Sequence, residues 1–198
     1  MVRLAQLLYA FFFVFCTLLG TLSAQTPTQT NTLPATSFAC EDFCFDVSFT
    51  NTDPATGYGP YYHFILPPEI SFVSVGFTPT GGSVIVNEVS TGLPITDPFT
   101  NEDIIVPVGH TFILFEMPVG SVNQGGPDLI TNLCGNISPT AALGVPLDIS
   151  IVPIFRFGDT ATGDNGFIVG DSSVVNITPT LLTFDKTVLD QHEEELPP

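Results

Sequence analysis

The sequence contains no tryptophan and almost no positive charge. Its 198 residues include 3 lysine and arginine residues against 20 aspartate and glutamate residues, for a formal net charge of −17. Arg3 is the only one of these charged residues within the first 24, so the rest of the chain has 2 basic and 20 acidic residues and a net charge of −18. Nucleic-acid binding needs a basic surface that neutralises phosphates, which excludes nucleic acid as a natural partner. An anionic membrane surface is disfavoured for the same reason, whereas calcium or a basic partner would be attracted.

Helical patterns are also missing. No segment of useful length repeats apolar residues at the helical period, and runs rich in Lys, Arg, Gln or Ala are scarce. Hydrophobic residues nevertheless make up 44% of the chain and include 18 phenylalanines, which is enough to fill a core. The segment FCFDVSFT places Phe43, Phe45, Val47 and Phe49 on one face with a strict period of two. This alternation predicts a half-buried strand.

Further short apolar runs lie between turn residues and predict strands of the same kind. They are YYHFILP (61–67), ISFVSVGF (70–77), SVIVNEV (83–89), DIIVPV (103–108), TFILFEMPV (111–119), PLDISIVPIFRFG (146–158), SVVNITP (173–179) and LLTFDKTVL (181–189). Pro153 predicts that its strand lies at a sheet edge or contains a bulge. The pattern predicts an all-β fold, an immunoglobulin-like antiparallel β-sandwich, with a closed barrel as the alternative.

The amino-terminal residues predict export. Residues 1–24 combine one positive charge, an apolar run and small residues before Gln25, which is the pattern of a cleaved signal peptide. The alternative, a membrane anchor, is disfavoured because the pure apolar core from Leu7 to Leu19 is shorter than the roughly 20 residues that span hydrocarbon. No later segment predicts a membrane span. We expect an exposed leader at 25–37, the sandwich at 38–180, and a last strand with an acidic linker at 181–198.

Three cysteines follow the predicted signal peptide: Cys40, Cys44 and Cys134. An exported chain permits one disulfide among them and leaves one thiol over. On an extended strand Cys40 and Cys44 would lie roughly 13 Å apart, so a bond between them would require a turn. The alternative is a bridge from one of them to Cys134, which closes a loop of about ninety residues and constrains the unfolded chain most. We favour this second bridge.

Four segments together resemble a known family of bacterial surface domains. They are FTNTDPATGYGPYYHFILP, FILFEMPVGSV, GVPLDISIVPIFRFGD and TPTLLTFDKTVLD, and the resemblance covers roughly Cys44 to Asp190. The family is the conserved-repeat domain called domain of unknown function eleven. The resemblance implies immunoglobulin-like modules that follow one another, so that LTFDKTV would lead into a next module beginning near Lys186. The end of the signal, Ser-Ala-Gln, looks like those of Bacteroidota.

The loop from Asp159 to Asp171 is a calcium candidate, because oxygen ligands on flexible glycine-rich backbone suit this ion. The ligands would be Asp159, Asp164, Asn165 and Asp171. Their spacing does not match an EF-hand, and the same residues are ordinary in turns. The acidic loop from Asp97 to Asp103 is a less favoured second candidate.

Aromatic residues supply a second candidate site. Tyr58, Tyr61 and Tyr62 lie near the loop at 57–60 and could form a platform for a sugar, although such platforms favour tryptophan. His63 and His110 with the cysteines could bind zinc, but the CxxxC spacing is unusual for such a site, and His63 fits a strand residue better.

The two remaining cations also have expected roles. Arg156 is expected to pair with a carboxylate, as a charge on a half-buried strand requires. Lys186 fits an exposed charge better than a lysine crosslinked to an asparagine.

No catalytic motif is present: GxSxG is absent, and no local group of nucleophile, base and acid is visible. The sequence therefore predicts a non-catalytic exported module, structural or adhesive, secreted or at the cell surface and with no cofactor, and the amino-terminal part of a longer repeat protein. The alternative is a secreted module that binds a glycan or calcium.

Overall fold

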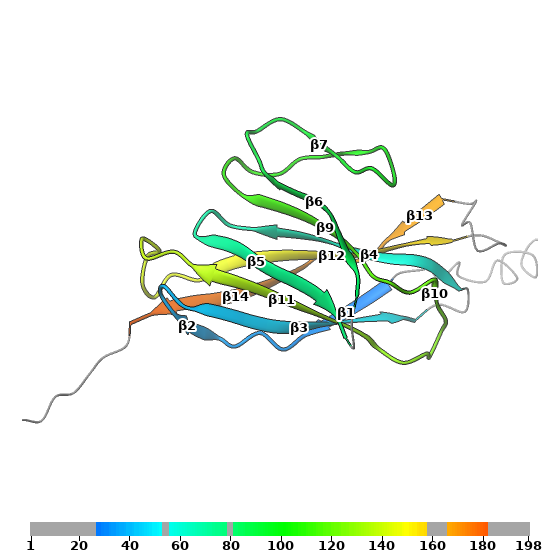
Figure 1. The fold of residues 1–198 in the computed structure, drawn as a ribbon, viewed down its shortest axis with the longest axis horizontal. Coiled ribbons are helices and arrows are strands. Elements are labelled where there is room, and N and C mark those ends of the chain that lie inside the picture. Colours follow the sequence, from blue (N-terminus) through cyan, green and yellow to red (C-terminus); the bar gives the residue numbers. More distant parts are fainter. Residues whose placement is uncertain (1–26, 53–55, 79–80, 158–165, 182–198) are drawn as a thin grey trace, which may run out of the picture.

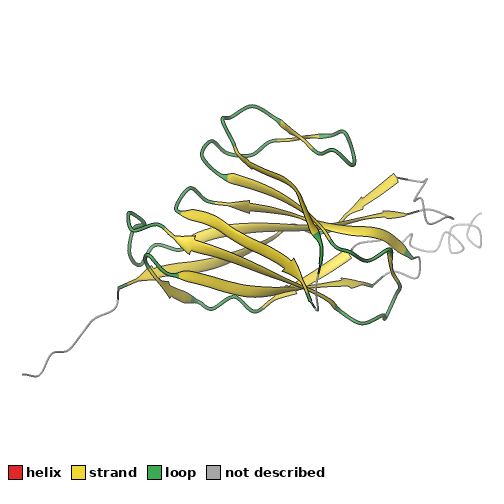
Figure 2. Cartoon of the chain, in the orientation of Figure 1, coloured by secondary structure: helices red, strands yellow, loops and turns green. Residues whose placement is uncertain are grey.

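A computed structural model of the chain describes residues 27–52, 56–78, 81–157 and 166–181, and every regular element in these ranges is a strand (Figures 1 and 2). The described residues contain no helix that could cross a membrane. The strands are β1 (Pro27–Asn31), β2 (Thr36–Phe38), β3 (Asp42–Asn51), β4 (Gly57–Leu66), β5 (Ile70–Phe77), β6 (Ser83–Val89), β7 (Ile95–Thr96), β8 (Asp103–Ile104), β9 (Thr111–Glu116), β10 (Ser121–Val122), β11 (Leu129–Ile137), β12 (Leu147–Phe157), β13 (Gly166–Val169) and β14 (Ser173–Thr180).

Two sheets pack face to face (Figure 1). The smaller sheet has the order β1-β3-β11-β5, and the larger has the order β2-β14-β12-β4-β9-β6, with β10 paired to β4 and β13 paired to β12. All pairs are antiparallel except β14 with β2. Both sheets are open, so the fold is the predicted antiparallel sandwich and not a closed barrel.

The main core lies between these two sheets. Phe43, Phe45, Val47 and Phe49 of β3 all point into it, as their alternation predicts. They meet inward residues of the larger sheet, including Phe64 and the other members of a cluster that β4, β9, β12 and β14 supply. Because each strand offers one apolar face every second residue, the two sheets bury a continuous layer.

A second, smaller core covers the outer face of the larger sheet. The segment between β6 and β9, residues 90–110, folds back over this face, and we call it the cover loop. Its base is closed by Ser90, whose N–H donates to the His110 carbonyl oxygen at 2.8 Å and whose hydroxyl donates to the Val106 carbonyl oxygen at 2.8 Å. The second core consists of Tyr61, Ile95, Val106, Phe112, Leu114 and Ile154. Strand β4 is therefore covered on both faces along most of its length.

Pro153 does not mark an edge, which corrects one alternative of the sequence prediction. Strand β12 lies inside the larger sheet, between β4 and the pair β14 and β13. It pairs with β14 up to Ile151 and with β13 from Ile154, so Pro153 lies at the break between these two partners. A missing N–H is tolerated there because no ladder bond is required at that position. The predicted bulge is present nearby, between Ile154 and Arg156.

The described residues of the expected leader at 25–37 are mostly exposed, but part of their backbone pairs with the sheets. Residues 27–31 form β1, which pairs with β3, and β2 pairs with β14. Strand β13 also falls within a segment that was predicted as a loop. The predicted signal peptide and the predicted strand and linker after Leu181 lie outside the described residues.

Candidate functional site

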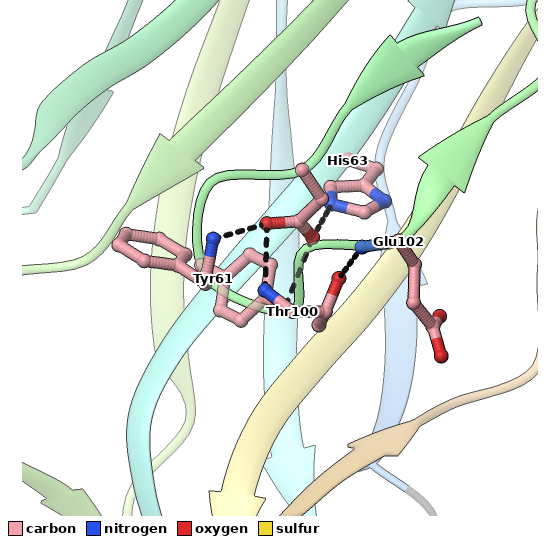
Figure 3. Close-up of polar contacts among 6 residues, drawn as sticks. Tyr61, His63, Thr100 and Glu102 are labelled. Carbon is pink, nitrogen blue, oxygen red and sulfur yellow. Dashed lines mark hydrogen bonds and ion pairs between the residues drawn. The ribbon is translucent and has the colours of Figure 1, made fainter.

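Three polar side chains meet beneath the cover loop (Figure 3). Tyr61 and His63 project from the same face of β4, and Asp97 reaches them from the cover loop. The Tyr61 hydroxyl donates to Asp97 Oδ2 at 3.3 Å, and His63 Nε2 lies 3.0 Å from the same oxygen. Since an ionised carboxylate can only accept hydrogen bonds, His63 Nε2 carries the proton and donates it to Asp97. We call these three residues the polar cluster.

The cover loop is shaped around Asp97. Its Oδ1 accepts the backbone N–H groups of Phe99 at 2.7 Å and Thr100 at 3.3 Å, an Asx turn that the following proline favours (Figure 3). The Asp97 backbone continues the turn, with Asn101 N–H donating to its carbonyl oxygen and its own N–H donating to the Glu102 carbonyl oxygen. One buried side chain thus both folds the loop and joins it to β4.

Burial and hydrogen bonding act in opposite directions on Asp97. Its burial raises the pKa of the carboxyl, while the hydrogen bond and charge of His63 and the N–H groups of Phe99 and Thr100 lower it, and the lowering prevails. The pKa of Tyr61 is raised above its ordinary range, first by burial and then by the charge of Asp97. Asp97 is therefore ionised and Tyr61 neutral at physiological pH.

The polar cluster has the residue types of a catalytic site but no access for a substrate. Tyr61 and Asp97 are 0% exposed and His63 is 6% exposed. All four hydrogen bonds that Asp97 accepts come from groups of the protein itself. A pocket of about 180 Å³ near β10 and β11 involves Val122 and Leu129, and none of the residues that line it ionises. Among the described residues the cluster is therefore best explained as an anchor of the cover loop.

The sequence did not predict this cluster. Asp97 was considered only as part of an acidic loop, and His63 only as a strand residue or a zinc ligand. The available signal was the Asp-Pro pair in the loop together with Tyr61 and His63 two positions apart on one strand face. Which loop acid would meet that face depends on tertiary folding, which the pattern does not reveal.

The predicted tyrosine platform is wrong as a group. Tyr61 and Tyr62 are fully buried, one in each core, and their rings pack against Phe99 and Phe49. They alternate across β4, so no ligand could stack on both. Tyr58 alone is partly exposed.

The described residues add no ligand to the predicted metal sites. Asp159, Asp164 and Asn165 lie outside the described residues, and Asp171 is exposed after β13. No group of three or more His, Cys, Asp or Glu side chains suited to a metal occurs in the described ranges. Calcium at the 159–171 loop stays a prediction. Zinc at His63 conflicts with its hydrogen bond to Asp97.

The disulfide is the favoured one, between one of the two early cysteines and Cys134. Cys44 and Cys134 are bonded, 90 residues apart in sequence, and they lie directly opposite each other on β3 and β11. The bridge therefore joins two neighbouring strands of one sheet. Cys40 is a free and exposed thiol.

Arg156 does not have the expected carboxylate partner among the described residues. Its guanidinium carbon instead lies over the rings of Phe99 and Phe167, at 5.3 and 5.6 Å from their centres. These contacts compensate part of the charge.

No family model matches this chain, and no curated protein matches its sequence. Solved structures do resemble its fold. A cohesin module from the family 33 glycoside hydrolase of Clostridium perfringens superposes with a TM-score of 0.55 at 9% identity, over 80% of this chain and 100% of that module. The sixth cohesin of scaffoldin B from Acetivibrio cellulolyticus, solved with a dockerin, gives a TM-score of 0.42 at 16% identity, over 81% of this chain and 100% of that one.

The major pilin subunit of Bacillus cereus gives a TM-score of 0.44 at 10% identity, over 86% of this chain and 45% of the pilin. At these identities the similarity concerns the fold, for which the Clostridium perfringens module is the informative match. The resemblance to domain of unknown function eleven stays a prediction.

Proposed function

We propose that this chain is a non-catalytic, exported module that acts at the cell surface, either as a structural spacer or in adhesion to an extracellular protein. The observation that carries the proposal is the burial of all three side chains of the polar cluster. The best acid, histidine and tyrosine arrangement of the described residues holds a loop in place and is closed to substrates.

Three further features agree with this function. The apolar start of the sequence predicts export, and structural disulfides occur mainly in oxidising compartments. The sandwich fold is also that of the cohesin module of Clostridium perfringens, a kind of domain found with a dockerin in the Acetivibrio cellulolyticus complex. By the resemblance of the sequence to repeat domains, the chain is the amino-terminal part of a longer surface protein.

A second candidate function is binding of a small extracellular ligand by a secreted module. The partly exposed aromatic and cationic side chains around Arg156 favour it. A spacer would bind nothing on a glycan array, whereas a binding module would retain particular glycans.

The proposal is tested by locating the protein in its source cells. We expect an antibody against the purified chain to label intact cells, protease added outside to remove the label, and the recovered protein to begin at Gln25. Release into the medium would favour the second candidate. Protein that is found only inside the cells, with Met1 retained, would overturn both.

A further inference from the structure

A row of three side chains crosses the outer face of the larger sheet at one end. Arg156 on β12 lies directly opposite Tyr58 on β4 and Phe167 on β13, so the three share one face. Phe99 of the cover loop lies beside them, because the Arg156 guanidinium carbon is over its ring as well as that of Phe167. We call these four residues the arginine cage. All four are partly exposed.

Among the described residues, no group accepts a hydrogen bond from the Arg156 guanidinium. In the described ranges Arg156 forms no ion pair, and its Nε is buried with no hydrogen-bond partner. Two aromatic rings attract the charge but do not replace an acceptor for its five N–H donors. A partly buried guanidinium in this state can gain a pair of strong, charge-assisted hydrogen bonds from a planar anion.

The acids near Arg156 in the described part of the chain do not supply such an acceptor. The charges of Asp97 and Arg156 both affect the pKa of Tyr61, so Asp97 is near the cage. Each Asp97 oxygen, however, already accepts two hydrogen bonds from other groups. The charge of Glu102 also affects the pKa of Tyr61, but the Glu102 side chain is exposed on the cover loop and forms no ion pair with Arg156 among the described residues. Arg156 is the single lysine or arginine in the described ranges. It is therefore the position where this acidic surface can best receive an anion.

The charge of the whole chain limits which anion can approach. A net charge of −17 repels phosphate groups, nucleic acids and acidic peptides more strongly than it repels a single carboxylate on a neutral molecule. The exposed parts of Tyr58, Phe99 and Phe167 add an apolar surface beside the cation. Ligand sites in proteins combine apolar and aromatic contacts with a few placed polar groups in this way.

From these features we infer that the arginine cage is a binding site for a carboxylated sugar, such as a uronic acid residue of an otherwise neutral glycan. The carboxylate accepts the two-pronged pair of N–H donors of Arg156, and the apolar face of the sugar ring packs on the aromatic side chains. The inference deepens the ligand-binding candidate above and does not depend on how the protein is retained at the cell.

The test follows the Nε–H signal of Arg156 by ¹H–¹⁵N NMR in the full chain purified after export. The signal is assigned as the one lost in Arg156→Lys. Glucuronic acid, up to about 50 mM at constant pH and ionic strength, should shift this signal with saturation in the weak range expected for one sugar. Glucose at the same concentrations should not shift it, and acetate and inorganic phosphate should bind several-fold more weakly.

Two substitutions that remove the same charge provide a matched comparison. Arg156→Gln should weaken glucuronic acid binding by at least about tenfold, as expected on losing a charge-assisted pair of hydrogen bonds. Lys186→Gln should leave it unchanged. Binding to these variants is followed through the shifts of backbone amides. Arg156→Lys keeps the charge but loses the planar fork, so it should also weaken binding. Its backbone amide spectrum should otherwise match that of the wild type, as expected if the fold is intact.

Several results would overturn the inference. One is the absence of a saturating shift with glucuronic acid. Equal affinities for acetate, phosphate and glucuronic acid would indicate a general anion site only. Equal weakening by Arg156→Gln and Lys186→Gln would indicate a general charge effect. None of these results would bear on export or surface location, so the proposed function would be judged separately.

Discussion

At the scale of single residues, this protein has many acids and almost no cations to pair with them. Amides and hydroxyls take the place of cations. Asn136 donates to Asp42 at 2.7 Å and Asn132 donates to Asp46 at 2.8 Å, both between directly opposed positions of β11 and β3. Asp97 is the buried extreme of this pattern, because its carboxylate is satisfied by a tyrosine, a histidine and two backbone N–H groups.

Replacing Asp97 by asparagine should destabilise the protein markedly. The substitution keeps the shape but removes the charge and turns an acceptor toward His63 and Tyr61 into a donor. We expect the free energy of unfolding in denaturant to fall by about 2 kcal/mol or more. Asp103→Asn is the matched control on the same loop, where the carboxylate accepts an exposed hydrogen bond from Thr96, and it should change stability by less than about 0.5 kcal/mol. Equal effects would contradict the anchoring role.

The same carboxylate predicts a pH dependence. The pKa of Asp97 is lowered from its ordinary value of 3.8 in the folded protein. Its contribution is therefore fully present above the unfolded pKa and is lost as the pH falls through the lower folded value. The difference in unfolding free energy between the wild type and Asp97→Asn should be constant from about pH 7 to pH 5 and shrink below about pH 4. A difference that grows on acidification would argue against this assignment.

Residue patterns predict the sandwich better than they predict its polar cluster. The alternation of Phe43, Phe45, Val47 and Phe49 is a local property, and the structure buries all four. Asp97 meets His63 only because residues 90–110 fold back over β4. No local sequence pattern predicts that residues 90–110 fold back over β4, so a buried anchoring aspartate and an ordinary acidic loop look alike in the sequence.

At the scale of elements, β3 and β11 hold the smaller sheet together. They are its two central strands, and the Cys44–Cys134 bond links them at opposed positions. The sequence pattern indicated β3 clearly but did not reveal β11, since the apolar residues of LITNLCGNI do not alternate with polar ones. Gly135 explains part of this irregular pattern. A Cβ there would lie 2.8 Å from Ile70 and 3.1 Å from Phe43, so a larger residue would not fit.

Removal of this disulfide should lower stability without changing the fold. Closing a loop of 90 residues restricts the unfolded chain, so reduction or the double change Cys44→Ser with Cys134→Ser should cost about 2–5 kcal/mol. The measurement is the denaturation midpoint with and without reductant. In protein that begins at Gln25, and so has only Cys40, Cys44 and Cys134, Cys40→Ser should leave that midpoint unchanged and abolish the one titratable thiol. A thiol that persists in Cys40→Ser would contradict the pairing.

At the scale of the whole molecule, the negative charge itself opposes compaction. A chain with 20 acidic residues and 3 basic ones repels itself most strongly when folded, because folding brings like charges together. Salt screens such repulsion over about 10 Å at 0.1 M. The thermal midpoint should therefore rise between about 0.01 M and 0.15 M sodium chloride. A midpoint that falls would mean that attractive pairs dominate the surface.

The whole molecule also contains two cores that differ in origin. The main core joins the two sheets, while the second depends on the cover loop, which Ile95 and Val106 hold from the apolar side and Asp97 from the polar side. The central claim of a non-catalytic module depends on the polar cluster being an anchor for this loop.

Amide hydrogen exchange in wild type, Asp97→Asn and Asp103→Asn tests that claim most directly. An anchor predicts that Asp97→Asn raises exchange throughout residues 90–110 and leaves β3, β11 and β12 protected, with Asp103→Asn like wild type. Unchanged exchange across 90–110 in Asp97→Asn would contradict the claim. The polar cluster would then need another explanation, and a catalytic role would have to be reconsidered.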